Sequence, residues 1–396
     1  MQRLVWMLCA ILLLGGAAHA QDKPPIVLGL NADMSSGSSA AGEGLRRGAV
    51  LAIAEINAQG GLLGGRKLQL MVRDHHGVAA RAETQVHEFA DTPNLVAVLG
   101  GLHSFAILPN LPFMHERQLI LMAPWSATTE VIDHGLTPNY AFRVSARDPL
   151  VAEFLVARAF KHGRSRLGLL LERSAWGRST EKAAGEALAR RQRTPAGVQW
   201  FSWTDTDEDM DAQLAALEKA GAQAILMVAN APEGSNIVKA MARRPPEKRL
   251  PLYAHWGISG GSFARLAGPS LSAVELYVFQ TFTFLGARDA RSQAFITAYN
   301  QMFGTTRPED ILVPTATAQA YDAVWLLALA IKKAGTTDRP QVREALEQLE
   351  PYKGLIRTYQ PAFTPSRHEA LELSDYKLTR FSPEGFLVPS PPEGRP

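Results

Sequence analysis

The sequence predicts an α/β protein of two lobes, each a doubly wound parallel sheet with helices on both faces. Short runs rich in Val, Ile and Leu alternate with helical patterns, as in sheets joined by crossover helices. The alternation begins again near residue 144, which indicates a second sheet. The chain has 396 residues, of which 46% are hydrophobic and 20% charged, so it is long enough for two cores.

The first series of elements opens with an apolar run near residue 26. We expect strands at residues 26–30, 67–73, 96–100, 119–122 and 140–144. Helical periodicity falls between these strands, at 49–57, 79–90 and 106–116. Each strand is followed by a helix or a turn, which predicts parallel neighbours.

The second series repeats this order. Helices are predicted at 150–160, 179–190, 210–220 and 236–243, and strands at 167–171, 198–203, 224–229 and 252–254. Three further helical patterns follow at 290–303, 315–334 and 340–349. Residues 352–388 are expected to form strands and loops, because Pro361, Pro365 and Pro383 interrupt them.

The N-terminus resembles a secretory signal peptide. Arg3 precedes an apolar run at 4–14, and Ala18-His19-Ala20 matches a cleavage site, so residues 1–20 are expected to be removed. The run is shorter than the ~20 residues that span a bilayer. We therefore predict a periplasmic protein with no stable membrane insertion after signal removal. Residues 389–396 form a Pro-rich tail that is expected to be disordered.

Charge and cysteine content exclude several classes of function. Lys and Arg number 41 against 38 acidic residues, a balance that does not favour a nucleic-acid partner. Cys9, the only cysteine, lies inside the apolar run, so the processed chain is expected to contain no disulfide and no cysteine nucleophile. We expect no cofactor.

Histidines and an aspartate near residue 75 invite comparison with a metal site. The candidates are Asp74, His75, His76 and His87. His75 and His76 would point to opposite faces if the strand continued through them. We therefore predict solvated loop histidines and no metal.

Several strings occur in an order that points to one family. Residues 52–70 read AIAEINAQGGLLGGRKLQL, an apolar helix face ended by glycines and followed by a strand. Further strings are VLGGLHS at 98–104, APWSAT at 123–128, FRVS at 142–145 with Asp148, WGR at 176–178 and AYDAV at 320–324. In this order they resemble the periplasmic solute-binding proteins of branched-chain amino acid (Leu/Ile/Val-binding) type ABC transporters, over about residues 26 to 388.

The resemblance implies the type I periplasmic binding protein fold, with two lobes joined by three crossovers. Lobe 1 would be 22–143 plus 279–355, and lobe 2 would be 144–278 plus 356–388. It also implies that the protein is not an enzyme: it would capture a small ligand between the lobes and deliver it to the membrane permease subunits of an ABC transporter. A ligand-sensing module of the same fold is the alternative.

Candidate ligand contacts lie where predicted strands end, because ligands of open parallel sheets bind beyond those ends. The loop 100–104 follows a strand and opens a helix, so His103 and Ser104 are placed at a carboxylate-sized site. The resemblance adds Trp125, Ser126 and Ala127 to the contacts. The alternative is that Ser104 only caps its helix.

Three tryptophans directly follow predicted strands. Trp125, Trp176 and Trp256 would form a flat apolar clamp if they face one cleft, and the alternative is that each packs at a lobe edge. Asn230 and Glu233 follow the strand at 224–229, but no clear carboxylate stands at a strand end of the second lobe. We therefore expect a carboxylate-bearing ligand that need not be an α-amino acid, such as an aromatic acid or an amide.

A secreted serine hydrolase is the least favoured alternative. Residues 257–261 read GISGG and match a nucleophile elbow, with Ser259 as nucleophile, His368 as base and Asp289 or Asp310 as the third member. No HGGG-type loop accompanies it, which disfavours an oxyanion hole.

Overall fold

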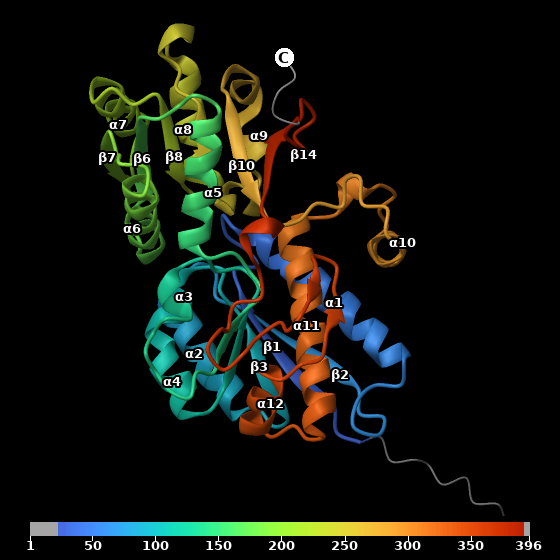
Figure 1. Ribbon diagram of the computed structural model, residues 1–396. Helices are drawn as coiled ribbons and strands as arrows, with labels where there is room; N and C mark the ends of the chain where they lie inside the picture. The colour runs from blue at the N-terminus through green and yellow to red at the C-terminus, as the bar shows by residue number, and fades with distance from the viewer. Residues whose placement is uncertain (1–22, 392–396) are drawn as a thin grey trace, which may run out of the picture.

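The computed structural model describes residues 23–391, so the predicted signal peptide lies outside the described residues, as does the tail beyond 391. Two sheets lie one above the other, the first in the lower half of Figure 1 and the second in the upper half. The chain passes between them three times, after β5, after β10 and before β13. The predicted fold class is thereby confirmed.

The first sheet is parallel, with strand order β2-β1-β3-β4-β5. Its strands are β1 Ile26–Ala32, β2 Leu68–Asp74, β3 Leu95–Leu99, β4 Ile120–Ala123 and β5 Ala141–Arg143. Alternate residues face opposite sides: Leu28 belongs to one core cluster and Val27 to another. This period of two explains why both faces carry helices.

Helices from both ends of the sequence cover this sheet. They are α1 Ser39–Ala58, α2 Ala79–Asp91, α3 Ser104–Ile107, α4 Leu111–Glu116, α11 Pro314–Ala334 and α12 Arg339–Leu346. Core residues of α2 and α4 pack on one face, while α1 and α11 lie along each other on the other face (Figure 1). Helix α10, Ala290–Phe303, reaches α1 through a hydrogen bond of 2.9 Å from the Arg47 guanidinium to the Tyr299 hydroxyl.

The second sheet has seven strands, in the order β14-β13-β10-β9-β8-β6-β7. They are β6 Leu167–Glu172, β7 Gly197–Phe201, β8 Ala224–Val228, β9 Leu252–Ala254, β10 Leu276–Gln280, β13 Lys377–Phe381 and β14 Leu387–Pro389. The first five are parallel, whereas β13 and β14 join antiparallel after the chain returns from the other lobe.

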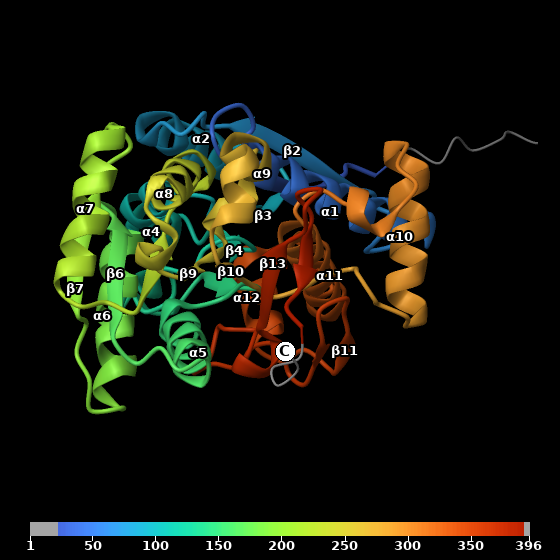
Figure 2. The ribbon, with the colours of Figure 1, turned by 90° about the horizontal axis from the view of Figure 1, so that it is seen from above.

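Two groups of helices enclose the second sheet. They are α5 Asp148–Lys161 and α6 Ala175–Ala189 on one face, and α7 Asp207–Lys219, α8 Ala231–Arg243 and α9 Phe263–Ala267 on the other (Figure 2). A short hairpin, β11 Tyr352–Lys353 with β12 Thr358–Tyr359, packs near α11 through the bond from the Tyr359 hydroxyl to Asp322. The lobe boundaries given above stay a prediction.

Two predicted helices differ most from those observed, while α6, α7 and α8 begin three to five residues before their predicted starts. The helix predicted at 106–116 is wrong as one element, because Pro109 and Pro112 divide it into α3, a 3₁₀ turn and α4. Helix α1 begins at Ser39, ten residues before the predicted start at 49. Among residues 23–391, no helix combines the length and apolar character required to cross a membrane.

Candidate functional site

Strand ends of both sheets open onto one cavity between the lobes. It is lined from the first lobe by the loops after β3 and β4, and from the second by those after β6, β8 and β9. All eight candidate residues line it: His103, Ser104, Trp125, Ser126, Ala127, Trp176, Asn230 and Trp256. Their role in ligand binding stays a prediction. The cavity measures about 30 Å³, room for about two water molecules.

The cavity is small because the lobes touch across it. Trp125 follows β4 and Trp256 follows β9, and their rings are stacked with centroids 4.7 Å apart and planes 18° from parallel. Beside them, the Thr129 N–H donates to the Ser179 hydroxyl at 3.1 Å. Each indole therefore covers the face of the other. The predicted clamp would hold a flat ligand in that place.

Trp176 brings a polar group to this wall. It lies in the first turn of α6, and its buried indole Nε1 has no hydrogen-bond partner among the described residues. Its ring meets His255 edge-on, with centroids 4.9 Å apart. The indole N–H is therefore a buried donor without an acceptor in the described part of the chain, which is unusual in a folded protein.

His255 supports the two second-lobe tryptophans from behind. Its Nδ1 accepts the Trp256 backbone N–H at 2.9 Å, so the neutral ring carries its proton on Nε2. Nε2 lies 3.3 Å from Asp148 Oδ1, and both side chains are fully buried. Burial lowers the pKa of His255, although Asp148 acts in the opposite direction. His255 thus fixes the backbone from which Trp256 projects.

The first-lobe loop after β3 approaches the neighbouring loop very closely. Gly101 has φ +122°, and a Cβ there would lie 3.0 Å from both the Trp125 carbonyl oxygen and the Ser126 Cβ. Only glycine fits this position. His103 occupies the N-cap of α3, so the alternative in which Ser104 caps the helix is wrong. Since α3 has only four residues, few peptide dipoles align behind it, and the site favours an anion less than a long helix would.

Arg143 holds the loop that carries Trp125. Its guanidinium donates to the Thr128 carbonyl at 2.7 Å and to the Ser126 carbonyl at 3.2 Å. The same group pairs with Glu369 through two hydrogen bonds, one of 2.7 Å, and both side chains are buried. A segment from the end of the chain thus fixes the first-lobe wall of the cavity.

Glu172 is the lining residue that sequence reasoning missed. It is the last residue of β6, is 6% exposed, and accepts a hydrogen bond of 2.9 Å from the Asn230 amide. The expectation that no carboxylate stands at a second-lobe strand end is therefore wrong. Burial raises its pKa, against the hydrogen bonds that lower it. The signal was a glutamate directly after the buried run at 167–171.

The residues of the hydrolase alternative are engaged separately. The Ser259 hydroxyl donates to the Trp256 carbonyl at 2.6 Å, while the two His368 ring nitrogens bond with the Ala141 carbonyl and Glu347. Asp289 accepts from a backbone N–H at the start of α10, and Asp310 pairs with Arg307. No hydrogen bond between described residues joins Ser259 to His368.

The histidine prediction is wrong for His75, which is fully buried, with its ring beside His103. The β2 strand ends at Asp74, the His75 N–H donates to the Ala32 carbonyl at 3.1 Å, and His76 takes the left-handed conformation. His76 is exposed, and His87 is exposed on α2. Within residues 23–391, no group of three or more His, Cys, Asp or Glu side chains is arranged to hold a metal.

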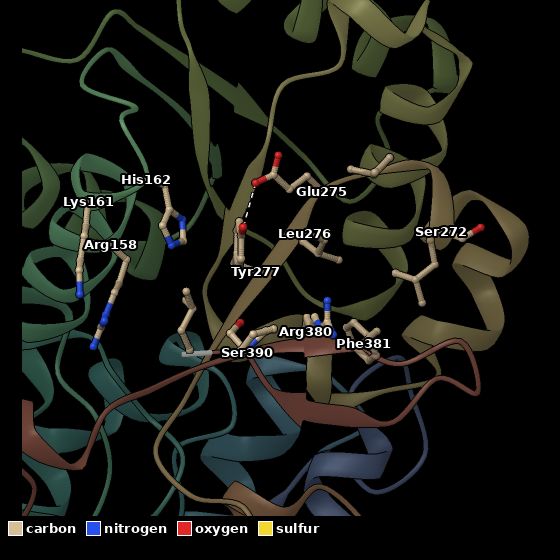
Figure 3. Close-up of a pocket in the computed structure, with 14 residues that line it drawn as sticks. Arg158, Lys161, His162, Ser272, Glu275, Leu276, Tyr277, Arg380, Phe381 and Ser390 are labelled. Atoms are coloured by element: carbon tan, nitrogen blue, oxygen red, sulfur yellow. Dashed lines mark hydrogen bonds between the residues drawn. The ribbon is translucent and has the colours of Figure 1, made fainter. Parts of the chain in front are cut away.

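A larger hollow of about 980 Å³ lies on the second lobe alone (Figure 3). Its walls come from α5, β10 and β13, and Tyr277 donates a hydrogen bond of 2.9 Å to Glu275 at its edge. Because every lining residue belongs to the second sheet or to the helices and loops of the same lobe, closure of the lobes would not enclose a molecule there. The cavity between the lobes remains the candidate site.

Comparison with known proteins identifies similar chains. The model of a family described as periplasmic binding protein matches residues 25–377. A Leu/Ile/Val-binding protein homolog 2 of Brucella abortus is 24% identical over 88% of each chain. A type 1 periplasmic binding protein of Bordetella pertussis superposes with a TM-score of 0.81 at 22% identity, over 92% of this chain and 100% of that one. A branched-chain amino acid transporter substrate-binding protein of Streptococcus pneumoniae, solved with isoleucine, gives 0.76 at 20% identity over the same shares.

Proposed function

The chain belongs to the periplasmic binding protein family, and from this premise we propose that it captures a small organic ligand, an amino acid or a related compound, between its lobes and delivers it to an ABC transporter. The observation that carries the proposal is the cavity whose walls come from strand ends of both sheets. A molecule bound there contacts both lobes only when they are closed. Binding therefore shifts the population toward the closed form.

The polar groups of the cavity suit an amino acid. Ser104 and the backbone near Gly101 supply donors for a carboxylate on the first lobe, and Glu172 supplies an acceptor for an ammonium on the second. Trp125 and Trp256 would enclose the apolar part once the ligand parts their stack. The relative from Brucella abortus is named for leucine, isoleucine and valine, and the protein from Streptococcus pneumoniae was solved with isoleucine, which supports an amino acid as the ligand.

A thermal-shift panel of amino acids, aromatic acids, amides and short dicarboxylates, followed by calorimetry, tests capture. A compound at 100 times its Kd should add ~2.7 kcal/mol of stability, with one site per chain. Ser104→Ala should weaken binding about tenfold, as expected for a lost hydrogen bond to a charged group. The exposed Ser366→Ala serves as the matched control. A panel without any shift would contradict capture.

Delivery to a transporter needs a separate experiment in the host cell. Deleting the gene should abolish high-affinity uptake of the labelled ligand, and restoring the gene should recover it. Uptake that continues at the wild-type rate would favour the ligand-sensing alternative instead.

A further inference from the structure

A second, larger cavity adjoins the site and shares two lining residues with it. It measures about 240 Å³ and is lined by both His103 and Asn230, which also line the first cavity. We call it the side chamber. The loops after β1, β2 and β3 supply its first-lobe wall, and those after β7 and β8 supply the other. A ligand longer than the first cavity has room to extend here.

The charges that line the two cavities are of one sign. Three carboxyl groups line them, those of Asp33, Glu172 and Glu233, and none of the described residues that line either cavity is Lys or Arg. A positively charged group on the ligand would supply a counter-charge to a carboxyl that the protein itself leaves unpaired. The lining therefore selects for cationic groups.

Asp33 already has its partners within the protein. It is fully buried and accepts backbone hydrogen bonds from Ser35, Ser36 and Ser38, at 3.2, 2.8 and 3.2 Å. His103 Nε2 lies 3.7 Å from its second oxygen. Burial acts to raise the Asp33 pKa, but these bonds hold it far below its usual range. Asp33 is thus a fixed negative charge in the chamber wall.

Glu233 is less well supplied, because the hydrogen bond that lowers its pKa comes from its own backbone N–H. It lies in the first turn of α8, and its buried Oε2 accepts no hydrogen bond from any residue between 23 and 391. Burial raises its pKa to about 7, and the neighbouring Glu172 acts in the same direction. A buried acceptor without a donor is unusual in a folded protein. An ammonium or guanidinium group in the chamber would satisfy it.

Aromatic rings complete the chamber. Trp203 follows β7 and is 49% exposed, yet its ring centroid lies 5.8 Å from that of His103 across the gap between the lobes. An indole face beside a carboxyl group attracts an organic cation and also covers its methylene chain.

We propose that the side chamber receives the terminal cationic group of the ligand, so that the preferred ligands are amino acids or amines with a basic end group. This inference rests on the proposed function, and it names the class of ligand within it. The Trp125–Trp256 pair would lie over the part of the ligand between its two charged ends.

Calorimetry with matched pairs of ligands tests the inference at pH 7.5. Arginine is compared with citrulline, its neutral counterpart of similar shape, and lysine with norleucine. We expect the cationic member of each pair to bind at least tenfold more tightly. Equal affinities within both pairs would overturn the inference and leave capture between the lobes intact. A panel in which no compound binds would contradict the proposed function as well, so the two failures are distinguishable.

A variant assigns the effect to the chamber. In Glu233→Gln the ratio of arginine to citrulline affinity should fall to threefold or less, whereas Glu247→Gln, at an exposed position of the same lobe, should keep the wild-type ratio. Thermal unfolding of both variants shows that they are folded. A wild-type ratio in Glu233→Gln would overturn the assignment of the cation to this chamber.

Discussion

Glu233 is a largely buried carboxyl group whose ionisation the folded protein opposes. In the folded chain its pKa is raised by burial to about 7, against an ordinary value of 4.5. The folded state therefore binds more protons than the unfolded state between these two values. Protonated Glu233 therefore contributes to the free energy of unfolding at low pH, and this contribution is lost as pH rises from about 4.5 to 7.

Glu233→Gln should remove this loss. The variant and the wild type should have similar melting temperatures at pH 4, and the variant should melt several degrees higher at pH 8. Melting curves at intervals between these pH values measure the difference. Asp33, Glu172, His76 and His103, which also face Glu233 or its chamber, are present in both proteins, so their titration largely cancels. A constant difference across the whole range would show that Glu233 is ionised throughout.

Single residues were also the hardest to place from the sequence. The candidate contacts could be predicted because strand ends converge by topology, whatever the details of packing. Glu172 was missed because a charged residue after a leucine run looks like the end of burial. His75 was misplaced because its backbone N–H still bonds to the Ala32 carbonyl beyond the end of β2, a tertiary contact that local sequence does not specify.

The positions of the strands could be predicted from the sequence, whereas those of the helices could be predicted only in part. Buried parallel strands are uninterrupted apolar runs, which are easily recognised. Helix α1 was predicted ten residues too late because three glycines, which are poor helix formers, fall in its first half. A Cβ on Gly48 would lie 2.0 Å from the Thr317 carbonyl oxygen, so the glycine allows α1 to approach α11 closely. Tertiary contact overrides local propensity there.

The pair of Arg143 and Glu369 shows how distant segments join at the cavity wall. Arg143→Met would leave Glu369 buried without its partner, which costs about 3–5 kcal/mol of stability. It would also release the carbonyl groups of residues 126 and 128, so ligand affinity should fall as well. Denaturant unfolding measures the first effect and calorimetry the second.

A double variant, Arg143→Met with Glu369→Met, separates the two effects. It removes the unpaired charge and should recover most of the stability, while the affinity stays low because the loop remains unsupported. Wild-type stability in the single variant would contradict the structural role given to the pair.

At the scale of the whole molecule, the two lobes are held in contact across an almost filled cavity. The stack of Trp125 on Trp256 and the bond from Thr129 to Ser179 both join one lobe to the other. In the proposed capture, a ligand enters when these contacts open, and the lobes then close with the two indoles on either side of it. We propose that this movement is the act of binding.

A cross-link between the lobes tests that claim most directly. The hydroxyl oxygens of Thr129 and Ser179 lie 3.1 Å apart, close enough for a disulfide after Thr129→Cys and Ser179→Cys substitution in a protein expressed without residues 1–20. If the account is right, oxidation before addition of the best panel ligand should abolish binding, oxidation after addition should trap the ligand, and reduction should restore exchange. Unchanged binding and release rates in the oxidised protein would contradict capture between the lobes.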